Sequence, residues 1–265
     1  IRGCTARMRG DGLDTRAIAA VSIDGTSGTV LALDAEHRPL TDGIMYNDPR
    51  ARAQAVRVHG ALAAQEAKLG YRFGASFSLP RLLWIRENLP QVYDRTAVFA
   101  HQADYVAGLL CGEFDVSDYS NALKTGYDLL DERWPDEIRR DLGMDPGKLP
   151  RIVRPGAPIA PVTAAAAGRL GLSTRTMVVG GSTDGYASAL AAGAVRAGRW
   201  ASIIGTTFVL KGVTKRLAID PDGSCYSHRL PSGEWLLGGA GNIGGRALNA
   251  CAAGRDFDAL NAESA

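Results

Sequence analysis

The sequence TMVVGGSTDGYASALAAG at residues 176–193, followed by WASIIGTTFVL at residues 200–210, decides the expected fold. Short apolar runs at residues 177–179 and 202–204 each end at glycine and hydroxyl residues, and small residues have helical spacing across residues 184–192. This order predicts a strand, a polar turn, a helix, a second strand and a second polar turn.

The two polar turns carry the residues of chemical interest. Asp184 stands at the start of the expected helix, where the helix dipole favours an ionised carboxylate that can take a proton from a hydroxyl. Gly205, Thr206 and Thr207 form the second turn, in which glycine lets a phosphate approach the backbone and threonine adds hydroxyl donors. Each motif alone is also an ordinary helix cap or turn. Together, a base and a phosphate-binding turn indicate a kinase.

Composition limits the classes of partner. The chain has 265 residues, of which 46% are hydrophobic, so it can bury a core of one large or two medium domains. Its 30 basic and 28 acidic residues are interspersed, which argues against a nucleic-acid or anionic-membrane partner and favours small molecules. Apolar stretches are shorter than the roughly 20 residues of a membrane helix. The four cysteines lack metal-ligand spacing, which favours reduced thiols and a cytoplasmic location.

A hydroxyl-rich loop, DGTSGT at residues 24–29, separates an expected strand that ends at Ile23 from another at residues 30–34. Short hydroxyl side chains suit hydrogen bonding to a polyol, and a plain hairpin turn is the alternative.

Further elements follow from periodicity and from capping residues. We expect a long helix that Asp48 caps and that reaches Lys68, and a second helix with Ser78 as its candidate cap. His101 has no partner nearby in sequence, so we interpret it as structural. The remaining expected elements are a strand at 97–99, helices at 102–111 and 162–170, a strand at 234–237 and a helix from Arg246 onward.

A connector is expected at residues 146–161, which contain five prolines and two glycines. It places a domain boundary between residues 155 and 156. The glycine-rich run at residues 238–245 does not have the spacing of a dinucleotide-binding loop, so a nicotinamide enzyme is not expected.

Five motifs resemble, in order and in rough spacing, those of the FGGY carbohydrate kinases. The motifs are SIDGTSGT at 22–29, YNDPR at 46–50, DYSNA at 118–122, GSTD at 181–184 and GTT at 205–207. The first two look most like the pentulose kinases of the ribulose and xylulose type. The first loop lacks the Gln-Met-His of xylulokinases, which favours a ribulose-like ketose.

The resemblance implies an incomplete actin- or hexokinase-type fold, in which two ribonuclease-H-like α/β domains enclose a cleft for ATP and Mg²⁺. Residues 1–155 would form the sugar-binding domain, and residues 156–265 the start of the catalytic one. Asp184 would be the general base, and no side chain is assigned to the metal. The other implied contacts are Thr26, Ser27 and Ser76 with the sugar, and Gly205, Thr206, Thr207 and Gly244 with the nucleotide. A sugar and ATP are the expected partners, and a homodimer is one assembly that this interpretation allows.

The ends of the sequence differ from the family pattern. No Asp-x-Gly-Thr segment of the first phosphate loop precedes Ile1, and the sequence stops soon after Gly244, so we expect an interior piece of a kinase. Residues 1–265 alone are then expected neither to bind ATP tightly nor to phosphorylate a sugar, because the transferred charge must be met from both sides of the cleft. The alternative is a shortened, catalytically silent sugar-binding relative. An ATPase of the chaperone or actin kind would not need a sugar loop.

Overall fold

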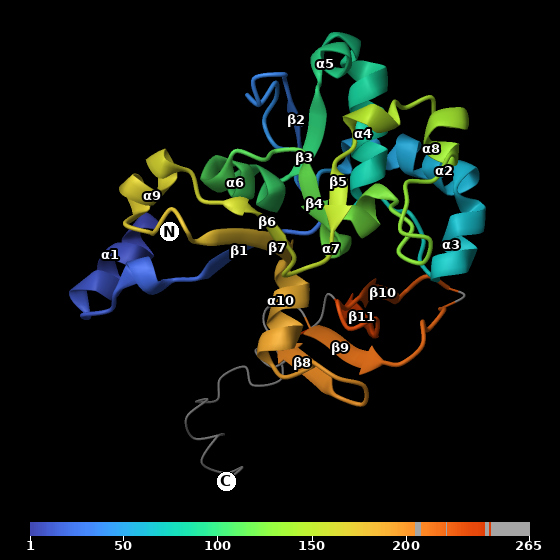
Figure 1. The fold of residues 1–265 in the computed structure, drawn as a ribbon. Coiled ribbons are helices and arrows are strands. Elements are labelled where there is room, and N and C mark those ends of the chain that lie inside the picture. The colour runs from blue at the N-terminus through green and yellow to red at the C-terminus, as the bar shows by residue number, and fades with distance from the viewer. Residues whose placement is uncertain (205–207, 221, 242–243, 245–265) are drawn as a thin grey trace, which may run out of the picture.

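Strand β7 (Met177–Thr183) is the centre of the first sheet (Figure 1). The computed structural model describes residues 1–204, 208–220, 222–241 and 244. Strand β1 (Ala20–Gly25) pairs with β7 in parallel, and β6 (Pro158–Pro161) pairs with it in the antiparallel direction. Helix α6 (Gln102–Cys111) packs on β1 and β7. The fully buried Val178 contributes to an apolar core that α6 shares with α9 (Ala164–Leu170).

Two shorter strand pairs extend this half of the molecule. They are β2 (Val30–Leu33) with β3 (Val98–His101), which are antiparallel, and β4 (Val116–Asp118) with β5 (Arg151–Val153), which are parallel. The largest apolar core lies among the helices beside them. The remaining helices of this half are α1 (Arg2–Gly10), α2 (Arg52–Ala61), α3 (Ala63–Leu69), α4 (Ser78–Asn88), α5 (Pro90–Arg95), α7 (Tyr119–Ala122) and α8 (Glu137–Arg140).

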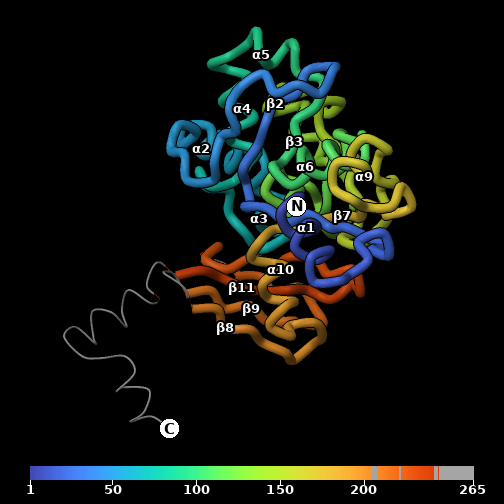
Figure 2. Tube along the Cα trace, turned by 90° about the vertical axis from the view of Figure 1, so that its left-hand side faces the viewer, coloured from blue at the N-terminus to red at the C-terminus, as the bar shows by residue number. Residues whose placement is uncertain are grey.

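A second sheet lies below the first and is reached through α10 (Asp184–Ala191), as Figures 1 and 2 show. It is antiparallel, in the order β10-β11-β9-β8. Its strands are β8 (Trp200–Ile204), β9 (Phe208–Thr214), β10 (Tyr226–Arg229) and β11 (Trp235–Gly241). Tyr186 and Ala189 of α10 pack on this sheet against Val213 and Leu236, so an apolar core holds the helix that follows β7 to the second sheet.

Most expected elements are present, and several of their boundaries are wrong. The long helix is instead the 3₁₀ turn η2 (Pro49–Ala51) followed by α2 and α3, which are separated at Leu62. Asp48 caps the turn as expected, since its side chain accepts a hydrogen bond from the Arg50 amide at 3.0 Å. Ser78 is the first residue of α4 and not its cap, because Phe77 has the extended cap conformation.

Three expected loops are partly strands. The proline-rich connector contributes β5 and β6, because a proline at the end of a strand or on an edge strand costs no ladder hydrogen bond. No polar turn separates β7 from α10, since the strand runs through Thr183 and the helix begins at Asp184. Strand β11 continues through Gly241, and the helix expected from Arg246 lies outside the described residues. No helix of the described part of the chain is long and apolar enough to cross a bilayer.

Arg81 of α4 holds three segments of the chain together, the loop at Gly28, the loop at Tyr46 and the residues that precede α4. Its side chain is fully buried, and its guanidinium donates hydrogen bonds to the carbonyls of Gly28 (3.0 Å), Phe77 (2.9 Å), Ala75 (2.6 Å) and Tyr46. Burial lowers the pKa of Arg81 to about 10, and the nearby Asp48 partly opposes this shift. The guanidinium is therefore charged at neutral pH.

Arg81→Met should lower the free energy of unfolding by about 2–4 kcal/mol, because it leaves buried carbonyls without donors. Arg81→Lys should recover part of that loss, since a single ammonium cannot reproduce the planar fork. Urea denaturation measures both, with Arg52→Met on an exposed part of α2 as the matched control. Equal stability of Arg81→Met and the control would contradict this role.

Candidate functional site

A pocket of about 310 Å³ lies where the two halves of the molecule meet. The loop after β1, the start of α10 and three strands of the second sheet contribute to its wall. The described residues that line it are Thr26, Ser27, Tyr46, Lys124, Thr183, Asp184, Gly185, Val209, Lys211, Tyr226, His228, Gly238, Gly239 and Ala240.

The structure brings together three of the residues predicted from sequence. Thr26 and Ser27 line the same pocket as Asp184, although Asp184 lies more than 150 positions after them in the chain. Ser76 does not line it, but its carbonyl borders the same loop. A Cβ atom at Gly28 would lie 2.6 Å from that carbonyl oxygen, and Gly28 has a φ of +91°, so only glycine fits there.

None of the four predicted nucleotide contacts is among the described residues that line the pocket. Gly205, Thr206 and Thr207 lie outside the described residues. Gly244 is buried in a bend and is not among the residues that line the pocket. The assignment of these four residues to nucleotide binding remains a prediction.

The position of Asp184 depends on a chain of hydrogen bonds that begins at Asp118. Asp118 accepts a hydrogen bond from the Ser120 hydroxyl at 2.7 Å, and that hydroxyl accepts one from the Thr183 amide at 2.8 Å. Asp118 also accepts from the Asn121 side chain at 2.7 Å. The DYSNA motif thus fixes the end of β7, the residue directly before Asp184. The Asp184 carboxylate is exposed toward the pocket and accepts from the Gly185 amide at 2.6 Å.

Burial dominates the electrostatics of Asp118. The side chain is 1% exposed, and burial together with the nearby Asp104 raises the pKa of its carboxyl, against the hydrogen bonds from Ser120 and Asn121. His101 joins the same buried region, with its Nδ1 2.7 Å from an Asp104 oxygen and its Nε2 2.8 Å from the Thr125 hydroxyl. The expected structural role of His101 fits this network, which is built within the core and away from the pocket.

The loop at residues 24–29 is not a hairpin turn, because β1 and β2 belong to different sheets. Thr26 is already engaged, with its hydroxyl 2.7 Å from Gln102 Oε1 and 2.8 Å from the Thr29 hydroxyl. The Ser27 hydroxyl is buried and has no hydrogen-bond partner among the described residues. Because a buried hydroxyl without a partner is costly, Ser27 fits a position that a polar ligand completes.

Several pocket residues with chemically active side chains were not predicted from sequence. Lys124, Lys211, Tyr226 and His228 gather at the pocket from the 3₁₀ turn η3 (Leu123–Thr125), β9 and β10. Burial lowers the pKa of both Lys124 and Lys211 to about 8. Burial and the two lysines hold the pKa of His228 well below its ordinary value, so its imidazole is neutral at pH 7. An isolated lysine in the apolar strand sequence FVLKGVT was the available signal for Lys211.

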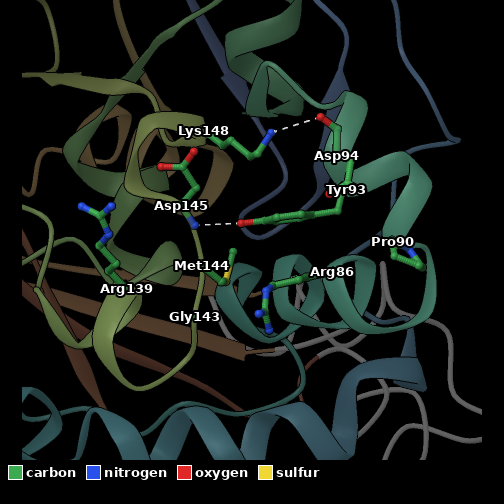
Figure 3. A pocket seen from close by; sticks show the side chains of 9 residues that line it. All are labelled: Arg86, Pro90, Tyr93, Asp94, Arg139, Gly143, Met144, Asp145 and Lys148. Atoms are coloured by element: carbon green, nitrogen blue, oxygen red, sulfur yellow. Dashed lines mark hydrogen bonds between the residues drawn. The ribbon is translucent and has the colours of Figure 1, made fainter.

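A larger hollow of about 670 Å³ lies elsewhere, between α4, α5 and the segment after α8 (Figure 3). None of the predicted site residues that the structure describes lines it. Two of its polar side chains make structural contacts, since the Tyr93 hydroxyl accepts a hydrogen bond from the Asp145 amide at 2.8 Å and the Lys148 ammonium donates one to the Thr96 carbonyl. The smaller pocket therefore remains the candidate site.

Residues 1–191 match the model of the N-terminal domain of the FGGY family of carbohydrate kinases. The chain belongs to this family. It is 31% identical to a xylulose kinase of Streptomyces rubiginosus over 222 residues, which cover 82% of the chain and 45% of that protein. It is 26% identical to a gluconokinase of Bacillus subtilis over 234 residues, 87% of the chain and 45% of that protein. The chain thus spans less than half the length of these relatives.

Solved structures agree with this assignment. The crystal structure of a xylulose kinase from Rhodospirillum rubrum superposes with a TM-score of 0.82 and 27% sequence identity, over 92% of this chain and 51% of the other. The expected α/β fold of the actin and hexokinase type is confirmed. The division into domains at residues 155 and 156 remains a prediction.

Lys124→Met and Lys211→Met should each raise the free energy of unfolding at pH 7 by about 1–3 kcal/mol in the absence of ligand, because each removes a buried ammonium and keeps an apolar stem. The folded pKa of about 8 lies below the ordinary value of 10.5, so between these two values the unfolded state binds more protons. Wild-type stability therefore rises with pH in that window, and the advantage of the variants shrinks.

Thermal or urea unfolding at pH 7 and at pH 10.5 measures this effect. Lys215→Met, on an exposed position after β9, is the matched control and should be neutral at both values. An advantage of the same size at pH 7 and pH 10.5 would show that ammonium burial is not its cause.

Proposed function

We propose that this chain forms the sugar pocket and carries the general base of an ATP-dependent carbohydrate kinase. The observation that carries the proposal is the shared pocket, in which the Asp184 carboxylate faces the Thr26–Ser27 loop. A phosphoryl acceptor must lie within hydrogen-bond reach of its base, and a sugar held by the loop would present its hydroxyl toward Asp184. Membership of the FGGY family supports the same reaction class.

In this mechanism Asp184 takes the proton of the attacking sugar hydroxyl as that oxygen bonds to the γ-phosphorus of ATP and the bond to ADP breaks. The hydrogen bond from the Gly185 amide, at the start of α10, orients the carboxylate. The Ser27 hydroxyl, which is buried without a partner among the described residues, would bond to the sugar.

Nucleotide binding would fall to Gly205, Thr206, Thr207 and Gly244. The described lining of the pocket offers one carboxylate, that of Asp184, so Mg²⁺ would be held mainly by the nucleotide phosphates. A metal bound in this way supplies charge neutralisation for the transferred group.

The proposed acceptor is a pentulose, D-ribulose or D-xylulose, with D-ribulose preferred. The small hydroxyl side chains of Thr26 and Ser27 support this choice, because sites built from hydroxyl groups discriminate against ligands that leave them without partners. Xylulose kinases among the relatives also favour a five-carbon ketose.

Asp184→Asn in the intact protein should lower kcat about 100-fold or more, since general bases contribute roughly 10²–10⁴, with little change in the affinity for sugar. A coupled assay of ADP release measures kcat, and calorimetry measures sugar binding. Asp42→Asn, at an exposed position that is not among the residues lining the pocket, is the matched control. Near-normal turnover by Asp184→Asn would remove this residue from the role of base.

Comparison of kcat/KM for D-ribulose, D-xylulose and glycerol tests the choice of acceptor. We expect the order D-ribulose, D-xylulose, glycerol, because glycerol leaves more of the pocket's polar groups without partners. Ser27→Ala should narrow the difference between D-ribulose and glycerol. A clear preference for glycerol would contradict the pentulose assignment.

A further inference from the structure

Two buried lysines face the candidate pocket from opposite halves of the molecule. Lys124 belongs to η3 and is 8% exposed, whereas Lys211 belongs to β9 and is 5% exposed. Each lies against a functional segment. A Cβ atom at Gly28 would be 3.5 Å from Lys124 Cδ, and one at Gly185 would be 3.7 Å from Lys211 Cε. One lysine therefore borders the hydroxyl-rich loop, and the other borders the start of α10 beside Asp184.

The wall of the pocket accommodates these side chains. A Cβ atom at Gly238 of β11 would lie 2.5 Å from Lys211 Cγ, so the glycine at this position gives the lysine stem its space. Tyr226 lies within reach of both ammonium groups, with its ring centroid 5.8 Å from Lys124 Nζ and 5.5 Å from Lys211 Nζ. Lys124 Nζ is also 5.6 Å from the Phe77 ring.

These aromatic contacts do not balance the charge. Cation–π contacts contribute about 0.5–2 kcal/mol, whereas burying an ammonium costs several kcal/mol. Among the described residues, neither lysine has a carboxylate within ion-pair distance, and Asp184 is the one carboxylate in the pocket lining. Arg81 from α4 adds a further positive charge near Lys124, and His228 from β10 is neutral.

We propose that Lys124 and Lys211 form an oxyanion site, which holds one carboxylate or phosphate group of a ligand bound against Asp184. Two lysines from different elements can converge on one anionic group, and three rotatable donors on each ammonium suit tetrahedral as well as planar oxyanions. The oxyanion is either an acid group of the polyhydroxy substrate or a phosphate group brought by the second substrate. This inference deepens the proposed function and rests on it for the identity of these two ligand sources.

Calorimetry on the intact protein at pH 7 tests the site with three probes, namely D-ribonate, inorganic phosphate and neutral D-ribulose. We expect at least one oxyanion to bind, and Lys124→Met and Lys211→Met each to weaken it about 10-fold or more. D-Ribulose affinity should change less than 3-fold, and Lys215→Met should match the wild type. If D-ribonate binds and phosphate does not, the site holds an acid group of the polyhydroxy substrate. If phosphate binds and D-ribonate does not, the site holds a phosphate group of the second substrate.

The pH dependence of the wild type gives a second readout that does not depend on the folding of a variant. Oxyanion affinity should fall between pH 7 and pH 9.5, since both lysines lose their protons in that range. Absence of oxyanion binding, or wild-type affinity in both methionine variants, would overturn the site even if D-ribulose is phosphorylated normally. Oxyanion binding that requires both lysines would support the site even if no sugar is phosphorylated, a result that would refute the proposed function alone.

Discussion

The buried guanidinium of Arg81 is the interaction on which the sugar side of the pocket depends. Carbonyls at Gly28, Tyr46, Ala75 and Phe77 converge on one side chain, and the hydrogen bonds to Gly28 and Phe77 are fully buried. Because Arg81 belongs to a helix that packs in the largest core, it fixes the loop at residues 24–29 relative to that core. The backbone of this loop, which forms the sugar side of the pocket, is therefore fixed by a side chain that is buried in the core.

A second set of interactions, independent of Arg81, positions the proposed base Asp184 at the pocket. Hydrogen bonds from Ser120 to Asp118 and from the Thr183 amide to Ser120 connect the start of α7 to the end of β7. The helix that begins at Asp184 therefore starts from a fixed point. Helix α10 then packs on the second sheet, which supplies Lys211, Tyr226 and His228. The two halves of the molecule thus share one helix, and a change in their packing would move the base relative to the loop.

Sequence reasoning succeeded where the signal is local. Helix α6 ends at Gly112 and α9 at Gly171, both with positive φ, and β7 leads to Asp184 as the apolar run predicted. The long helix breaks at Leu62, two residues after Gly60, and this glycine inside the helical pattern was the available signal for the break. Lys124 and Lys211 share the pocket because distant segments meet there, and neither has a recognisable motif.

Lys124 and Lys211 give the pocket an excess of positive charge. Among the described residues of the pocket wall, Asp184 supplies the one carboxylate, and Lys124 and Lys211 supply two ammonium groups. The charge of Asp184 partly restores the pKa of each lysine that burial lowers. If Asp184 accepts a proton during catalysis, that support is lost at the moment when negative charge gathers on the transferred group. The lysines would then be drawn toward the developing oxyanion, so that the base and the buried cations act on the same step.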